Sequence, residues 1–199
     1  MLDYLDERQS VAEEWAERER EIVKSFTQER LKSYYIGHPD LMREAQRALT
    51  DAKNLLAAGH VNAALVFAGT ALEVGYKAAL LRPIVSGLVH NEAFADLIMG
   101  LTTEHTGLER FSGLLTAILA EFAQVDLKSF VREQSNRQFW DEMKMVASDR
   151  NAIVHKGIDA EEAAASTAVA VADTLLNVLL PKVLGSVGLK IRGGKVLGT

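Results

Sequence analysis

The chain contains no cysteine among its 199 residues. This absence excludes disulfide bonds, thiolate nucleophiles and cysteine-ligated zinc, and it agrees with a reducing cytosol, so we expect a cytoplasmic protein. The sequence also lacks an uninterrupted apolar run of about 18 residues, which predicts that no segment spans a membrane. The N-terminus opens with Asp3, Asp6 and Glu7, which is unlike the basic and then apolar start of a secretory signal.

Several motifs that would point to a cofactor or a metal are missing as well. The sequence has no glycine-rich phosphate loop, no nucleophile elbow and no repeat period. The histidines show no ligand spacing such as two His one helical turn apart. We therefore expect no cofactor and no metal site. The five histidines are His38, His60, His90, His105 and His155.

The net charge of the chain bears on whether it binds nucleic acid. The formal net charge is −5, which is wrong for a protein that binds nucleic acid over its whole surface by neutralising phosphates. Any contact with RNA must then be local. The composition, 48% hydrophobic and 25% charged, is that of a globular protein, and the length allows one domain with a proper core.

The first 37 residues predict a long polar helical arm. Val11, Trp15, Ile22 and Phe26 form a narrow apolar stripe of coiled-coil width. A helix this polar buries little against its own domain, so it could lie across a second subunit. The stripe fits an outer helix of a single bundle equally well.

Residues 38–185 predict an all-α helical bundle. Apolar periodicity predicts helices over residues 41–58, 61–81, 91–101, 108–122, 136–157 and 160–184, while residues 125–133 stay ambiguous. The helix over 61–81 is apolar nearly all round and is rich in small residues, so it should be central. Residues 186–199 form a Gly-rich basic tail, which predicts either a small hairpin or a flexible end.

Local signals predict where these helices begin and end. Asp40 is placed to cap the second helix, and Asp159 with Glu162 resembles a capping box. Arg82-Pro83 should stop the central helix, and Pro181 should kink or tighten the last turns of the final one.

One polar cluster stands out at the end of the helix that begins near Asn136. The apolar stripe Phe139, Met143 and Val146 leads to Arg150 on the same line. A guanidinium on a buried line needs a partner, because its charge cannot be lost by deprotonation. Gly157 can end the helix in the left-handed conformation.

Arg150 has close polar neighbours in the sequence. Asn151 and His155 are four residues apart and share one helix face. Arg150 and His155 are about 140° apart around a helix, so they converge only if the helix loosens there. Together with Lys156, this grouping of an arginine, an amide and a titratable imidazole suits a phosphate.

Glu73 is the one acidic residue of the central helix, and two interpretations of it remain open. It could form a surface pair with Lys77, four residues on. Alternatively, it could face Arg150 and fix the guanidinium, since buried arginines usually find a carboxylate.

The segment Arg150-Asn151-x-x-x-His155, at the end of an amphipathic helix, resembles the signature of the HEPN superfamily, an Arg and a His separated by four to six residues. The segment 63–81 is similar to the family's earlier core helix, with an Ala-Leu-Glu element at Ala71, Leu72 and Glu73. The resemblance covers about residues 41 to 180 and leaves out the N-terminal helix and the tail.

The resemblance implies a metal-independent endoribonuclease that acts as a homodimer, with Arg150 and His155 of two protomers meeting at the interface. It implies RNA as substrate, Asn151 and Glu73 as supporting residues, and Lys156 as a further phosphate contact. It also implies a setting in toxin–antitoxin systems or defence, with an antitoxin or sensor protein as a partner.

Two other interpretations are kept beside this one. A HEPN-like module could serve binding or assembly without catalysis, because a fold does not establish an activity. Alternatively, Arg150 and His155 could merely pair with Glu73 and a helix end within the core.

Overall fold

The computed structural model describes residues 18, 27–88, 108–192 and 194–198, and every structural statement below concerns these residues. Residues 27–37 are helical. The remaining described elements are α2 (Arg43–Ala57), α3 (Val61–Tyr76), η1 (Lys77–Leu81), α4 (Arg82–Leu88), η2 (Leu108–Phe111), α6 (Ser112–Ala123), α7 (Phe139–Lys156), α8 (Glu162–Thr174), η3 (Leu175–Leu179), α9 (Leu180–Ser186), β1 (Leu189–Arg192) and β2 (Lys195–Gly198). The predicted all-α fold class is confirmed.

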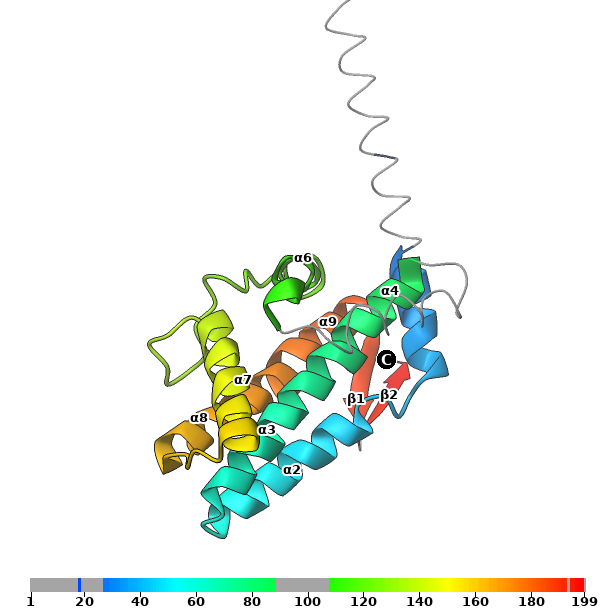
Figure 1. The fold of residues 1–199 in the computed structure, drawn as a ribbon. Helices are drawn as coiled ribbons and strands as arrows, with labels where there is room; N and C mark the ends of the chain where they lie inside the picture. Colours follow the sequence, from blue (N-terminus) through cyan, green and yellow to red (C-terminus); the bar gives the residue numbers. More distant parts are fainter. Residues whose placement is uncertain (1–17, 19–26, 89–107, 193, 199) are drawn as a thin grey trace, which may run out of the picture.

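Helix α3 lies at the centre of the bundle, as its apolar composition predicts. It packs against α2, α7 and α8 (Figure 1). The small residues Ala64, Ala68, Ala71 and Gly75 are buried along it. A Cβ added at Gly75 would lie 2.6 Å from Leu176 Cδ2, so the close approach of η3 to this helix depends on the glycine.

The described end of the predicted arm is part of the core. Leu31 and Tyr35 are 0% and 1% exposed, and both lie in the helix over residues 27–37. The rest of the predicted arm, with its stripe, lies almost entirely outside the described residues. This helix ends at residue 37.

The central helix continues past Pro83, so the prediction that Arg82-Pro83 stops it is wrong. A π-helical turn, η1, precedes the proline, and the Arg82 N–H bonds the Lys77 carbonyl five residues back. A regular α-helix would leave the Ala79 carbonyl facing Pro83, which has no N–H to donate. Here the Tyr35 hydroxyl donates to the Ala79 carbonyl at 2.5 Å, and the helix runs on as α4.

Pro181 has a similar setting near the end of the last long helix. The π-helical turn η3 precedes it, and the Leu180 N–H bonds the Leu175 carbonyl. Pro181 then lies in the first turn of α9, which continues directly from η3. The predicted disturbance is therefore a widening of the helix before the proline, not a tightening.

Two predicted caps are wrong. Helix α2 begins after Met42 with no side-chain cap, and the Asp40 carboxylate instead lies 4.0 Å from Arg43 and 3.9 Å from Lys195. Helix α8 begins after Glu161, also with no side-chain cap. The Asp159 carboxylate accepts a hydrogen bond from Asn62 at 2.7 Å, so α3 holds it away from the end of α8.

Some helix ends agree with the sequence prediction, and the start of α7 does not. Gly59 and Gly157 end their helices with φ of +79° and +64°, as predicted. Residues 125–133 are irregular, and α7 begins at Phe139, three residues later than expected. The helix predicted over residues 91–101 lies outside the described residues.

The tail forms the hairpin that was one of its two predicted states. Strands β1 and β2 are antiparallel, with Ile191 opposite Val196. Leu189 and Val196 are 1% and 2% exposed, and the Val196 N–H bonds the Pro39 carbonyl at 2.9 Å. The hairpin is therefore packed onto the bundle near the end of the first described helix (Figure 1).

Two helical stretches, Val61–Gly87 and Glu162–Ser186, are long and apolar enough to cross a membrane by length and composition. The sequence expectation of no span rested on the lack of an uninterrupted apolar run, which is a narrower criterion. Both stretches belong to the centre of the bundle, where 61% and 44% of their most apolar windows are buried. Core helices meet the same criterion, so it does not decide where the protein resides.

Candidate functional site

Arg150 ends a buried stripe on α7, as predicted. Phe139, Met143 and Val146 are 0%, 1% and 2% exposed, and the Arg150 side chain is 32% exposed. Its methylene stem lies against Gly69 of α3, where an added Cβ would be 3.2 Å from Arg150 Cβ and Cδ. The glycine therefore lets the arginine lie flat against the central helix, with its guanidinium at the rim.

Glu73 makes both of the contacts that the sequence left open. Its Oε2 lies 3.4 Å from Arg150 Nη1, while its Oε1 accepts a hydrogen bond from Lys77 Nζ at 2.7 Å. One carboxylate thus faces two cations, so this cluster of three side chains has a surplus of positive charge. Both partners of the Arg150 pair are about one-third exposed, which leaves the pair at the surface.

Tyr76 borders the same cluster from the core side. Burial raises the pKa of its phenol far above the ordinary value, the Glu73 charge raises it further, and the Arg150 charge opposes the rise. On the same side, Arg150 Nε is buried and has no hydrogen-bond partner within the described part of the chain. Buried donors normally have a partner, so this nitrogen marks the guanidinium as incompletely satisfied.

Asn151, His155 and Lys156 lie on the exposed last turns of α7. Among the residues that the structure describes, none of these three side chains makes a hydrogen bond or an ion pair. The helix stays regular through Lys156, and Gly157 ends it in the left-handed conformation. The loosening that would bring His155 toward Arg150 is therefore absent from this helix, and the two side chains leave it about 140° apart.

The structure thus assembles only part of the predicted site within one chain. Arg150 meets Glu73, and Asn151, His155 and Lys156 remain open to solvent nearby. A guanidinium held by one carboxylate still has other N–H groups that can bind phosphate oxygens. Within the described ranges, no group of three His, Cys, Asp or Glu residues could hold a metal ion.

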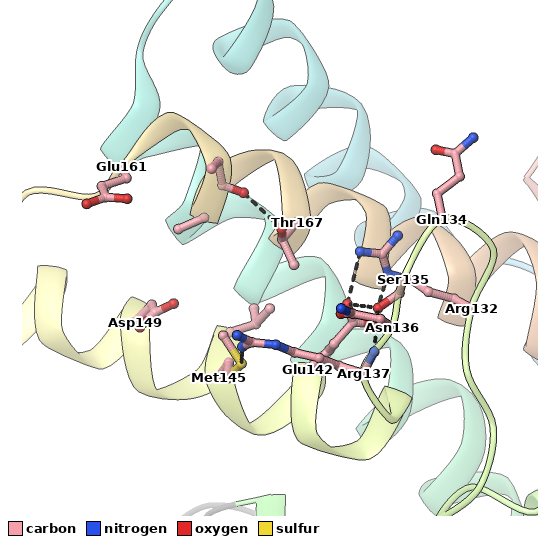
Figure 2. Close-up of a pocket in the computed structure, with 13 residues that line it drawn as sticks. Arg132, Gln134, Ser135, Asn136, Arg137, Glu142, Met145, Asp149, Glu161 and Thr167 are labelled. Carbon is pink, nitrogen blue, oxygen red and sulfur yellow. Dashed lines mark hydrogen bonds and ion pairs between the residues drawn. The ribbon is translucent and has the colours of Figure 1, made fainter.

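A second polar cluster, at the start of α7, was missed by the sequence reasoning. Glu142 is 2% exposed. Its two oxygens accept hydrogen bonds from Arg132 Nε and Nη2 at 2.8 and 2.9 Å, and Ser135 Oγ donates to it at 2.8 Å. These three residues tie the loop before α7 onto the helix (Figure 2).

A signal for this cluster was present in the sequence. Glu142 lies three residues after Phe139 and four before Val146, so it shares the buried face of the helix with them. A carboxylate on that face requires a cation. Its partner could not be identified because Arg132 belongs to an irregular segment without periodicity.

A hollow of about 430 Å³ lies beside this cluster, between the loop, α7 and the start of α8. Figure 2 shows Arg137 reaching along α7 toward Met145, with Asp149 further along the helix and Glu161 on the opposite wall. The full lining consists of Arg132, Gln134, Ser135, Asn136, Arg137, Glu142, Met145, Val146, Asp149, Glu161, Ala163, Ala164 and Thr167.

No protein-family model, no curated protein and no solved structure matches this chain.

Proposed function

We propose that the protein is a metal-independent endoribonuclease of the HEPN type, with Arg150 and His155 as its catalytic residues. The single observation that carries this proposal is the placement of Arg150. Its guanidinium is held at the rim of the bundle by Glu73 at 3.4 Å, one residue before the exposed face that carries Asn151 and His155. A positioned cation and a solvent-accessible imidazole are the minimum that this chemistry requires.

The proposed reaction uses a nucleophile that RNA itself supplies. The 2′-hydroxyl attacks the adjacent phosphorus, and the bond from phosphorus to the 5′-oxygen breaks. His155 takes the 2′-proton or donates one to the leaving oxygen, because an imidazole titrates near neutral pH. Arg150 binds the phosphate and stabilises the charge that grows on its oxygens. The products are a 2′,3′-cyclic phosphate and a 5′-hydroxyl.

Three further residues, Asn151, Lys156 and Glu73, support the catalytic pair in this proposal. Asn151 shares a helix face with His155 and could orient the imidazole or the phosphate by hydrogen bonds. Lys156 is exposed and provides a further cation for the RNA backbone. Glu73 holds the guanidinium in place, as its contact with Arg150 indicates.

The proposal requires two protomers. Because Arg150 and His155 leave the same regular helix about 140° apart, one phosphate is better served by Arg150 of one chain and His155 of another. We therefore expect a homodimer, and light scattering at tens of micromolar should give twice the mass of the chain. A strict monomer at this concentration would count against the composite site.

A non-catalytic binding or assembly module is the second candidate, and one observation favours it. Glu73 already neutralises part of the Arg150 charge at 3.4 Å, and a phosphate would have to approach past this carboxylate. The net charge of −5 also opposes RNA binding. An antitoxin or sensor protein as partner remains a prediction under either candidate.

Cleavage of RNA in EDTA separates the two candidates. If the 2′-hydroxyl is the nucleophile, RNA should be cut without metal, DNA of the same sequence should survive, and a 2′-O-methyl group should block the scissile position. His155→Ala should lower the rate by about 10² to 10⁴, the usual contribution of one acid–base group. His60→Ala is the matched control, because His60 is also exposed and at a helix end.

Mixing two inactive variants tests the composite site. A heterodimer of Arg150→Ala and His155→Ala retains one intact pair if the residues meet between chains. Random mixing should then restore about a quarter of the parental activity. If the mixture shows no activity, Arg150 and His155 do not form a site between two chains. If the parent protein itself does not cleave RNA, the ribonuclease proposal fails and the non-catalytic binding module is the remaining candidate.

A further inference from the structure

We propose that the hollow between the loop 132–137, α7 and α8 binds a small zwitterion that carries an ammonium group at one end and a carboxylate at the other. The inference is independent of the proposed ribonuclease activity. It rests on three properties of the hollow: its size, the opposite charges on its walls, and the rigidity of the loop that forms one wall.

The size of the hollow suits a small molecule. Its volume is about 430 Å³, within the range of roughly 300–1,000 Å³ that is usual for ligand pockets. Three separate segments of the chain form its walls (Figure 2). A ligand there would contact two helices and a loop at once.

The lining carries charges of both signs that the protein leaves unpaired. Arg137 is exposed, and its guanidinium contacts the Met145 sulfur at 2.7 Å, which is a weak acceptor. Asp149 of α7 and Glu161 at the start of α8 also line the hollow. Across the described part of the chain, none of these three charged groups forms an ion pair.

The loop that carries Arg137 is tied to α7 by hydrogen bonds. Arg132 and Ser135 both bond the buried Glu142 carboxylate, and the Arg137 N–H bonds Ser135 Oγ at 3.1 Å. Gln134 sits in this loop with φ of +63°, a conformation that costs energy for a residue with a side chain. Such strain persists where surrounding contacts determine the loop, and a preformed wall lowers the entropy cost of binding.

The distribution of charge selects the class of ligand. A phosphate would gain from Arg137 but would be repelled by Asp149 and Glu161. A simple cation would gain from the two acids but would be repelled by Arg137. A molecule with a single carboxylate and a single ammonium group has a partner for each of the three charged residues, because arginine pairs well with a carboxylate and two acids suit an ammonium group.

Calorimetric titration of the full chain with three matched probes tests this inference. The probes are 6-aminohexanoate, hexanoate and hexylamine, which carry both groups, only the carboxylate and only the ammonium group. Shorter ω-amino acids down to glycine establish the spacing of the walls. We expect at least one ω-amino acid to bind about tenfold or more tightly than either single-ended probe of the same length, the effect of one charged hydrogen bond.

Variants assign each end of the ligand to its wall. Arg137→Gln should abolish the preference over the matched amine, whereas Asp149→Asn combined with Glu161→Gln should abolish the preference over the matched carboxylate. Lys128→Gln is the control, because Lys128 is exposed and lies outside the hollow. All four residues are on the surface or half-buried, and thermal melts of each variant without ligand establish that it folds.

Three outcomes would overturn the inference. The first is that no ω-amino acid binds at tens of millimolar. The second is that single-ended and zwitterionic probes bind equally. The third is that Arg137→Gln and Asp149→Asn are coupled in stability without ligand, because Arg137 would then close the hollow by pairing with Asp149 in solution. A ribonuclease that fails in EDTA leaves the inference unaffected, because no step of the titration involves RNA.

Discussion

Arg150 Nη1 lies 3.4 Å from Glu73 Oε2, and the same carboxylate accepts a hydrogen bond from Lys77. Glu73 is therefore shared between a partner on its own helix and one on α7. This sharing joins two helices at the point where the candidate site begins, so the position of the guanidinium depends on the relative placement of α3 and α7.

The Glu73–Arg150 pair should contribute modestly to stability. Both side chains are about one-third exposed, so solvent screening reduces their attraction. A double-mutant cycle of Glu73→Gln and Arg150→Gln, measured by urea unfolding, should give a coupling free energy of about 0.5–1 kcal/mol. If the two free-energy changes are additive, Glu73 interacts with Lys77 and not with Arg150. A coupling free energy of several kcal/mol would mean that solvent screens the Glu73–Arg150 pair less than its exposure indicates.

Gly69→Ala should move Arg150 without removing any charge. The new Cβ would lie 3.2 Å from the arginine stem, so the guanidinium must shift by a few tenths of an ångström. We expect ribonuclease activity to fall by up to about tenfold, since catalysis is sensitive to small displacements. Gly113→Ala is the matched control, because nothing lies within 4 Å of its added Cβ. If Gly69→Ala and Gly113→Ala are equally active, the position of Arg150 does not matter for catalysis.

Glu142→Ala should be among the most destabilising single substitutions in the described part of the chain. The change leaves Arg132, whose side chain is only 13% exposed, without its bidentate partner. Loss of one member of a buried pair costs about 3–5 kcal/mol, measured as the free energy of unfolding in urea. Glu133→Ala, at an exposed neighbouring position, should change it by about 0.5 kcal/mol or less.

Alkaline pH should destabilise the fold through two buried tyrosines. Burial raises the pKa of Tyr35 and of Tyr76 far above the value of about 10 expected for an unfolded chain. Because the folded pKa values are the higher ones, the stability is present below about pH 10 and is lost as the pH rises toward them. Unfolding free energies measured across pH 9 to 11 should decline accordingly.

Tyr35→Phe is the variant that checks the source of this decline. It removes one titrating group, so the slope of stability against pH above about pH 10 should become shallower by up to about 1.4 kcal/mol per pH unit. It also removes the donor to the Ala79 carbonyl, which should cost about 1–3 kcal/mol at neutral pH. An unchanged slope would show that Tyr35 ionises in the folded state.

Helix α7 was predictable from sequence because it buries a single regular stripe. The line Phe139, Met143 and Val146 is almost wholly buried, and its spacing alone predicted that Arg150 continues the same line. Gly157 could be assigned as a helix end because its left-handed conformation favours glycine. Periodicity and backbone chemistry act locally, so they can be read from the sequence of the segment itself.

Features that depend on distant residues could not be predicted in this way. Asp159 looked like a cap for its own helix, but Asn62, 97 positions away, holds it by a hydrogen bond. Arg132 lies in an irregular loop, and nothing in the local sequence identifies Glu142 as its partner. The convergence of Arg150 with Glu73 was one of two open alternatives, because helix faces restrict partners without choosing among them.

The two π-helical turns have a consequence for how this sequence could vary. Each turn admits one residue more than an α-helix of the same rise, so the side chains after it are rotated by about 100° relative to a regular helix. Deleting one residue from η1 would restore the regular winding and leave the buried face of α4, including Ile84, toward the core. A single deletion elsewhere in the same helix would instead rotate the following side chains by about 100°. One-residue deletions should therefore be tolerated better within η1 and η3 than at other positions of these two helices.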